Sequence, residues 1–342
     1  MRWQDPSSEA LVRKFSRGAV AFLTLGAFLL TLGVAMKVYA YDRLAVVPKD
    51  QNTQQILSDD NANFFDADNV APGSGPITTI ATVIGDPDLA KEAADENDGG
   101  DIAVFTKGQS TDNNDQAPPV DFLEQTFAID RYTGAAVPWS GASQNGEPIE
   151  FEGQLIKFPF NTQKKSYDYW DATVKAPMKM EFEGTEEVEG TDGSINTYRF
   201  SGSIDETEFG IREVPRGVFG LADTGSVEAT RTYANDRTIW VEPETGVMVK
   251  IEEAQKQWLK LDEPGADDVV AMDTVSASSP ETIQANIDEY GSKSTTLKAV
   301  RTWLPFAIGG LGILSLLAGA ALAIRFKSRH GADADDDAYA NA

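Results

Sequence analysis

The sequence of 342 residues contains no cysteine and only one histidine, His330. Without cysteine, the chain can form neither a disulfide nor a thiol nucleophile. A lone histidine near the C-terminus leaves the rest of the chain without a Ser-His-Asp triad or a zinc site of ordinary ligand composition. We therefore predict no catalytic residue, no metal site and no cofactor, and we interpret the protein as a non-enzyme.

Basic residues are also scarce, with 29 Lys and Arg against 54 Asp and Glu and a formal net charge of −25. This balance excludes binding of nucleic acid or of an anionic membrane surface through bulk electrostatics. A carboxylate-dependent hydrolase stays open as an alternative, because two acidic side chains suffice for glycoside hydrolysis. With so many acids, however, the sequence marks no particular pair.

Two long runs carry no charged residue, residues 18–36 and 303–324. Each is long enough to cross about 30 Å of hydrocarbon as a helix. We predict transmembrane helices over residues 18–40 and 303–324. A cleaved signal peptide is an alternative for the first, since Val38-Tyr39-Ala40 resembles a small-residue cleavage site behind an apolar core.

Basic residues lie beside both runs in the sequence: Arg13, Lys14 and Arg17 before the first, and Arg325, Lys327 and Arg329 after the second. Because Lys and Arg near a span stay on the cytoplasmic side, we predict a two-pass plasma-membrane protein with both termini cytoplasmic. Residues 1–17 form the cytoplasmic N-terminus, residues 41–302 the extracytoplasmic domain, and residues 325–342 a cytoplasmic, disordered tail.

The exported region has the pattern of a β-rich domain. Residues 77–84 and 102–106 are rich in β-branched side chains and predict strands, while Pro87 predicts the start of a short helix. The Asn- and Asp-rich residues 50–75 are expected to be a loop. From residue 122 onward strands dominate, with two similar hairpins around Thr-Gly turns at residues 131–134 and 243–246.

Aromatic residues gather in residues 151–182. There Met178, Met180 and Phe182 alternate with charged residues, and this period of two places the apolar groups on one face of a strand. That face is buried either in a packed core or around an apolar ligand, since barrels of moderate strand number can enclose one. Periodicity does not separate the two interpretations.

Four motifs in order resemble one known family: FAIDRYTG at residues 127–134, KFPF at 157–160, KSYDYWD at 165–171 and IWVEPETG at 239–246. They are similar to the LmcA-like family of two-pass actinobacterial envelope proteins, catalogued as a domain of unknown function and also labelled "porin PorA family". The resemblance covers nearly the whole chain. It implies a mainly β fold, an elongated antiparallel β-barrel with a few helices and apolar cavities, flanked by the two spans, and a role with mannosylated phosphoinositide glycolipids in lipomannan and lipoarabinomannan assembly.

The residues and the resemblance together predict a membrane-anchored lipid- or glycolipid-binding or transfer protein of the cell envelope. A non-catalytic scaffold for envelope glycosyltransferases is the alternative. Eleven aromatic and methionine residues are the candidates for lining the apolar cavity: Phe158, Phe160, Tyr169, Trp170, Met178, Met180, Phe182, Tyr198, Phe200, Trp240 and Trp258.

Overall fold

The computed structural model describes residues 17–66, 69–113, 120–221 and 225–340, with side chains described as far as residue 326. The chain divides into two compact units. We call residues 1–44 with 295–342 the span unit and residues 45–294 the β unit. Each is described by itself.

The span unit contains two helices long and apolar enough to cross a membrane, at Arg17–Leu44 and Trp303–Phe326. The first comprises α2 (Arg17–Ala35), the π-helical turn η1 (Met36–Ala40) and α3 (Tyr41–Leu44), and the second begins α6 (Trp303–Ala340). Both uncharged runs are thus helical, as predicted. The backbone of α6 stays helical to Ala340, where the sequence had suggested a disordered tail, and the alanines of this segment have high helix propensity.

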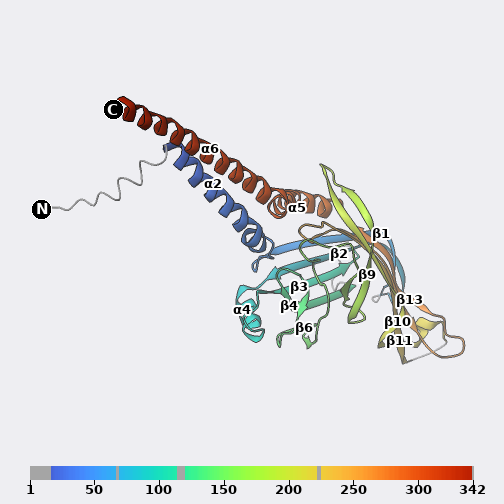
Figure 1. The fold of residues 1–342 in the computed structure, drawn as a ribbon. Helices are drawn as coiled ribbons and strands as arrows, with labels where there is room; N and C mark the ends of the chain where they lie inside the picture. The colour runs from blue at the N-terminus through green and yellow to red at the C-terminus, as the bar shows by residue number, and fades with distance from the viewer. Residues whose placement is uncertain (1–16, 67–68, 114–119, 222–224, 341–342) are drawn as a thin grey trace. The chain divides into compact units, whose positions relative to one another are not determined.

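Small residues allow α2 and α6 to lie side by side (Figure 1). A methyl group added at Gly26 would approach Leu316 Cγ to 2.7 Å and Gly312 O to 2.8 Å. The hydroxyl of Ser315 donates to the backbone oxygen of Phe22 at 2.8 Å. Close backbone approach through small residues and hydroxyl-to-backbone hydrogen bonds are typical of helix pairs in membranes.

The described residues of the β unit form one 13-stranded sheet in which every strand pairing is antiparallel. Its long strands are β1 (Asn52–Asp66), β2 (Ala71–Gly85), β3 (Ile102–Asp112), β4 (Asp121–Asp130), β9 (Ala176–Glu189), β10 (Ser194–Pro215), β11 (Ser226–Val241), β12 (Met248–Lys260) and β13 (Val269–Ser278). Its short strands are β5 (Ala136–Val137), β6 (Ser143–Gln144), β7 (Glu147–Pro148) and β8 (Tyr167–Asp171). The spatial order is β7-β6-β4-β3-β2-β1-β13-β12-β11-β10-β9-β8, with β5 beside β4.

The prediction of a closed barrel is wrong, because the first and last strands of this order, β7 and β8, do not pair. In the described part of the chain, the two ends are linked by isolated bridges from Gln154 to Ala135 and to Tyr169, and by a hydrogen bond from Gln144 Nε2 to Ala172 O at 2.8 Å. The linking segment lacks the regularity of a strand: Gly153 has a φ of +71° and lies so close to Asp168 O that a Cβ would stand 2.4 Å from it. The sheet is therefore mainly β and antiparallel, as expected, but open.

One further expectation is wrong at the start of the β unit. Most of residues 50–75 are strand and not the expected loop, because β1 and the first residues of β2 pair across this region. The polar side chains that suggested a loop lie on β1, whose backbone pairs with β2 on one side and with β13 on the other.

The helix expected at Pro87 is present as α4 (Pro87–Glu96). It is capped by Asp86, whose carboxylate accepts from the backbone nitrogens of Asp88 and Leu89.

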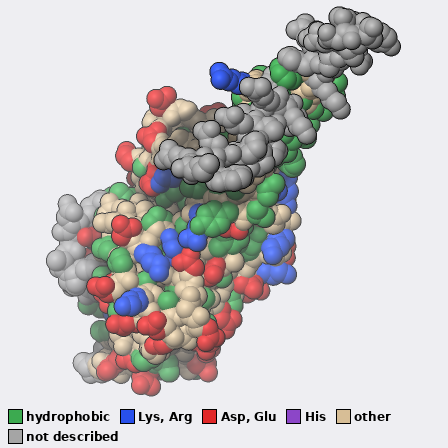
Figure 2. Space-filling view, turned by 60° about the vertical axis from the view of Figure 1, so that its left-hand side comes forward, with side chains coloured by type: hydrophobic (Ala, Val, Ile, Leu, Met, Phe, Trp, Pro, Cys, Tyr) green, Lys and Arg blue, Asp and Glu red, His purple; other side chains and the backbone are tan. Residues whose placement is uncertain are grey.

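The helix α5 (Pro280–Arg301) follows β13, and the hydroxyl of Ser279 accepts from Thr282 N at 3.2 Å at its start. Within the β unit, Ile287 of α5 is buried in a cluster with Trp240 and Val249. This helix covers the outer face of β11 and β12 locally. Elsewhere the surface of the β unit is rich in acidic side chains (Figure 2), as the composition requires.

Candidate functional site

Seven of the eleven predicted cavity residues come together in one cluster on one face of the sheet, which we call the inner face. These residues, the aromatic–methionine cluster, are Phe158, Tyr169, Met178, Met180 and Phe200, with Phe182 and Tyr198 packed against them. The rings of Phe158 and Phe200 stack with centroids 4.9 Å apart, and both side chains are fully buried. In this conformation the cluster fills its own space, and its role in lining a ligand cavity stays a prediction.

The other four predicted residues lie in separate places. Phe160 stacks on Tyr132, and Trp170 contacts Phe151 edge to face at 5.2 Å. Trp240 faces α5, and Trp258 is half-buried with the Lys260 ammonium 5.6 Å from its ring centroid. The structure therefore does not bring all eleven residues into one site.

The KFPF motif is held by the two predicted hairpin turns, which have the same hydrogen-bond pattern. Asp130 accepts from the Thr133 nitrogen and hydroxyl in the first turn, and Glu242 accepts from those of Thr245 in the second. The backbone nitrogen of Phe158 donates to Gly246 O at 2.7 Å. The backbone nitrogen of Phe160 donates to Tyr132 O at 3.2 Å, so backbone hydrogen bonds connect the KFPF motif to both turns.

Lys157 within this motif is only 6% exposed. Its ammonium has no hydrogen-bond partner among the described residues and lies 3.5 Å from the centroid of the Phe160 ring. Burial lowers the pKa of Lys157 well below its usual value, although the nearby carboxylate of Asp130 acts in the opposite direction. The aromatic face of Phe160 offers this side chain a cation–π contact.

Beside the aromatic–methionine cluster, the inner face carries charged side chains that we call the ionic cluster. It consists of Lys107, Asp171, Tyr233, Arg237 and Glu253. Arg237 Nη2 lies 3.2 Å from Asp171 Oδ2, Arg237 Nε donates to Glu253, and the Tyr233 hydroxyl donates to Asp171 Oδ2 at 2.9 Å. Lys107 on β3 is within electrostatic range of Arg237, Glu253 and Asp171, so β3 faces β11 across the curved sheet.

These surroundings shift several pKa values. Burial lowers the pKa of Lys107 to about 8, assisted by the positive charge of Arg237 and opposed by the two carboxylates. Burial would lower the pKa of Arg237, but Glu253 and Asp171 raise it above its usual range. Burial raises the pKa of Tyr169, which adjoins the cluster, to about 12. The neighbouring Tyr233 has its pKa raised by burial and by Asp171.

Sequence reasoning missed the ionic cluster. Its members come from β3, β8, β11 and β12, and only the curvature of the sheet brings Lys107 to Arg237. One local signal exists: Tyr233, Asn235 and Arg237 alternate with Ala234 and Asp236, which places the three on one face of β11. A polar stripe of this kind next to buried Ile239 indicates an interior that is not uniformly apolar.

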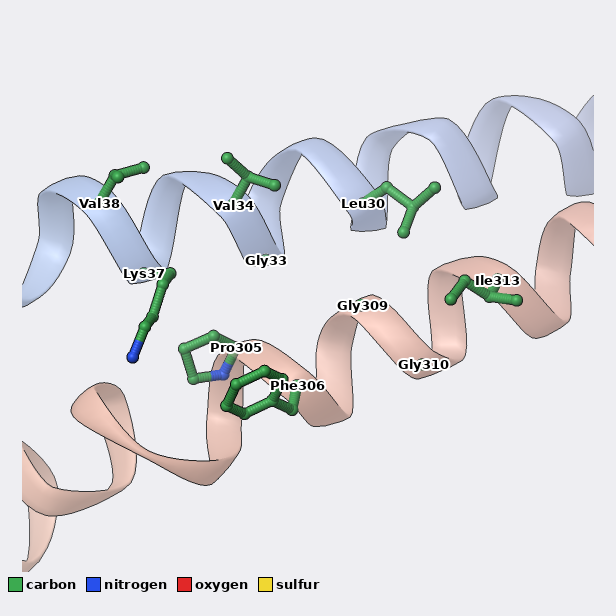
Figure 3. A pocket seen from close by; sticks show the side chains of 10 residues that line it. All are labelled: Leu30, Gly33, Val34, Lys37, Val38, Pro305, Phe306, Gly309, Gly310 and Ile313. Carbon is green, nitrogen blue, oxygen red and sulfur yellow. The ribbon is translucent and has the colours of Figure 1, made fainter.

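The span unit has a groove between α2 and α6 with a volume of about 410 Å³ (Figure 3). Leu30, Gly33, Val34, Lys37, Val38, Pro305, Phe306, Gly309, Gly310 and Ile313 line it. Its space exists because residues 309 and 310 have no side chain: a methyl group added at Gly309 or Gly310 would meet nothing within 4 Å. At Gly33, by contrast, a methyl group would stand 3.0 Å from Pro305 O, so the helices touch there.

One cation stands at an otherwise apolar lining. Lys37 reaches from η1 toward the start of α6 (Figure 3), donates to Arg301 O at 3.2 Å and lies 5.8 Å from the Phe306 ring centroid. Nearby in sequence, Arg43 stacks on Tyr39 at 5.0 Å. An apolar groove with an ammonium group at one end matches the chemistry of a lipid with an anionic headgroup.

Within the described ranges, no three His, Cys, Asp or Glu side chains come together in a way that could hold a metal ion. The carboxylates of the ionic cluster instead engage Arg237. The arrangement therefore offers ion pairing and hydrogen bonding on the inner face and an apolar surface in the groove.

Comparison with known proteins agrees with a membrane protein of the cell envelope. The family model described as "Porin PorA" matches residues 18–321. A Corynebacterium resistens protein named "Porin PorA" is 24% identical, over 89% of this chain and 95% of its own length. A Corynebacterium amycolatum protein of the same name is 22% identical, over 73% of this chain and 80% of its own length. With every strand of the sheet and nearly all of both spans inside the matched range, this chain belongs to the Porin PorA family.

Proposed function

We propose that this protein binds envelope lipid through the groove between α2 and α6, with an acyl chain along the glycines and an anionic headgroup at Lys37. The observation that carries the proposal is the groove itself, which is apolar along its length and has one ammonium group at its end. Three glycines, Gly33, Gly309 and Gly310, contribute to its lining.

Selectivity in such a groove comes from shape and charge. An acyl chain leaving the bilayer gains little from apolar burial alone, because lipid tails are as apolar as the groove. Contact between Lys37 and a phosphate adds about 1 kcal/mol at a membrane surface. The proposal therefore expects discrimination among headgroups more than tight binding of any tail.

The membrane arrangement belongs to the same proposal. Basic residues flank the two spans on one side, so the termini are cytoplasmic and the β unit is extracytoplasmic in the plasma membrane. The groove residues Lys37 and Pro305 then lie at the outer leaflet. Transfer of mannosylated glycolipids, a role in lipoglycan assembly and docking of glycosyltransferases are finer predictions that rest on the family resemblance.

The name of the relatives suggests a pore, and the outer face of the β unit argues against a pore built from its strands. A membrane barrel needs an apolar outer band. Here the outward side chains of β9 and β10 are charged: Lys179 and Glu181 are 65% and 62% exposed, and Arg199 is 44% exposed. We therefore assign membrane contact to α2 and α6.

The test uses the full chain in lipid nanodiscs with a few per cent of a phospholipid carrying a photoreactive group on its acyl chain. We expect cross-links concentrated on groove residues for the anionic lipid and fewer for a zwitterionic one. Gly310→Leu fills the groove and Lys37→Gln removes its charge, so each should reduce these cross-links several-fold. Ala320→Leu, at an exposed position of the same helix, should not.

Two outcomes would contradict the proposal. One is cross-linking spread evenly over the exposed faces of α2 and α6 in the unsubstituted protein. The other is equal cross-linking of the groove in Gly310→Leu and Ala320→Leu.

A further inference from the structure

The inner face of β11 carries a buried amide with no visible purpose in the fold. Asn235 is 1% exposed, and both its Nδ2 and its Oδ1 lack a hydrogen-bond partner among the described residues. A buried polar group without a partner costs about 1–3 kcal/mol. Strand interiors rarely retain such a residue unless something binds it.

The neighbouring Arg237 is also incompletely used. Its Nε and Nη2 engage Glu253 and Asp171, whereas Nη1 has no partner in the described part of the chain. Its side chain is 10% exposed. Asn235 and Arg237 are two residues apart on a continuous stretch of β11, so both project to the inner face, where Tyr233 and Arg237 meet Asp171.

Several polar side chains around these groups are not fully buried. Lys107, Gln109 and Gln255 all face inward by strand register and all keep part of their surface accessible. Gln255 is the partner of Asn235 across the β11–β12 ladder. Solvent therefore reaches polar groups of the inner face next to the buried amide and the guanidinium.

The spare hydrogen-bonding capacity decides the class of ligand. Nδ2 of Asn235 and Nη1 of Arg237 are donors, and Oδ1 of Asn235 is an acceptor. An oxyanion satisfies the donors but not the acceptor, and it would lie beside Asp171 and Glu253. A hydroxyl group both donates and accepts, and adjacent hydroxyls match an amide that presents both functions.

We propose that the inner face of the sheet at Asn235 and Arg237 binds a neutral polyhydroxyl compound, a sugar or related polyol. Asn235 accepts from one hydroxyl and donates to a second, while Arg237 Nη1 donates to a hydroxyl oxygen. Asp171 and Glu253 hold Arg237 in place, and the Tyr169 ring, 5.2 Å from the Arg237 guanidinium, supplies an apolar neighbour for the C–H face of the ring. Lys107 borders the site from β3.

This inference goes beyond the lipid groove, because it concerns a different unit of the chain and a polar ligand. Either can fail alone. A Gly310→Leu protein should keep the polyol site, and an Asn235→Leu protein should keep the groove.

The experiment is saturation-transfer difference NMR on the full chain in a detergent without a sugar headgroup, with D-glucose, D-mannose and D-galactose as probes. We expect a saturable signal for at least one hexose. Asn235→Leu should weaken that binding by at least about tenfold, which corresponds to the loss of hydrogen bonds to the ligand. Asn196→Leu, at an exposed position of β10, should leave it unchanged.

Stability without ligand provides the second measurement. Replacing an unpaired buried amide by an apolar group of similar shape is neutral or stabilising. Asn235→Leu should therefore melt no lower than Asn196→Leu in sugar-free buffer. The proposal is overturned by the absence of a saturable signal for all three hexoses, by equal binding in both variants, or by a clear loss of stability in sugar-free Asn235→Leu, which would show that the amide already has its partner in the fold.

Discussion

Arg237 and Asp171 form an ion pair on the inner face of the sheet, with Nη2 3.2 Å from Oδ2 and side chains only 10% and 1% exposed. The two residues come from β11 and β8, which are separated by β10 and β9 in the sheet. Oδ1 of Asp171 also accepts from the backbone nitrogens of Thr173 and Val174, so this carboxylate has partners on both oxygens. The pair connects β8, at one end of the sheet, to β11.

Removing the carboxylate should therefore destabilise the β unit strongly. Asp171→Ala removes the acceptor of the Tyr233 hydroxyl and one of the two carboxylates that pair with the buried Arg237 guanidinium, and the expected loss is about 3–5 kcal/mol in the free energy of unfolding. Asp168→Ala, at an exposed position of the same strand, should change it by no more than about 0.5 kcal/mol. Urea unfolding followed by tryptophan fluorescence measures both, and equal midpoints would contradict the prediction.

Lys107 should make stability depend on pH in the alkaline range. Its pKa is about 8 in the folded protein and near 10.5 when unfolded, so between these values the unfolded chain binds one more proton. Stability then rises with pH across this window, by up to about 3 kcal/mol at full effect. The charged and titratable groups around Lys107 are Arg237, Glu253 and Asp171, with Tyr169 and Tyr233 adjoining them.

The measurement compares unfolding of the unsubstituted protein and Lys107→Met at pH 7.5 and 10.5. As the pH rises from 7.5 to 10.5, the unfolding free energy of the unsubstituted protein should increase relative to that of Lys107→Met. A difference that stays constant would mean that Lys107 has its ordinary pKa.

The turns, the helix cap and the spans of this protein could be predicted from the sequence, whereas the open form of the sheet could not. The turns at Asp130 and Glu242, the cap at Asp86 and both spans depend on residues a few positions apart, and all were predictable. The open sheet was not, because it depends on whether β7 meets β8 after a long irregular connection.

The candidate site was also only partly predictable from the sequence. Period-two alternation placed Met178 and Met180 on a buried face correctly, but it could not show that Phe158 and Phe200 would fill the space in front of them. The groove depends on glycines, and only the packing of α2 against α6 shows which of them lie at helix contacts and which leave space. Gly33 is a point of contact, whereas Gly309 and Gly310 leave room, and the sequence does not distinguish them.

Gly246 should be far more sensitive to substitution than another glycine with the same backbone conformation. Gly246 has a φ of +74°, and a Cβ there would stand 2.0 Å from Phe158 O. Gly193 has a φ of +88°, but a Cβ there would meet nothing within 4 Å. Gly193→Ala should cost only the left-handed conformation, about 1–2 kcal/mol.

Gly246→Ala adds a steric clash with backbone to that conformational cost and must break the contact between Phe158 N and Gly246 O. We expect a loss of more than about 3 kcal/mol, measured by urea unfolding against Gly193→Ala. Similar losses in the two variants would show that the close packing of Gly246 against Phe158 contributes little to stability.

Gly26 should control the pairing of the two spans. A side chain there would enter the space occupied by Leu316 and Gly312, because even a methyl group would approach them to 2.7–2.8 Å.

The measurement is a cross-link between the two spans. Since the chain has no cysteine, the Leu30→Cys and Ile313→Cys pair introduces the only thiols available to a short bis-maleimide in membranes. Both positions line the groove on opposite helices. We expect Gly26→Ile to reduce the intramolecular cross-link several-fold. Gly18→Ile on the same helix, where a Cβ would meet only Leu322 Cδ1 at 3.8 Å, should retain it. If both variants cross-link alike, the close approach at Gly26 does not hold the helices together, and the groove beside it would not have the fixed shape that lipid selection requires.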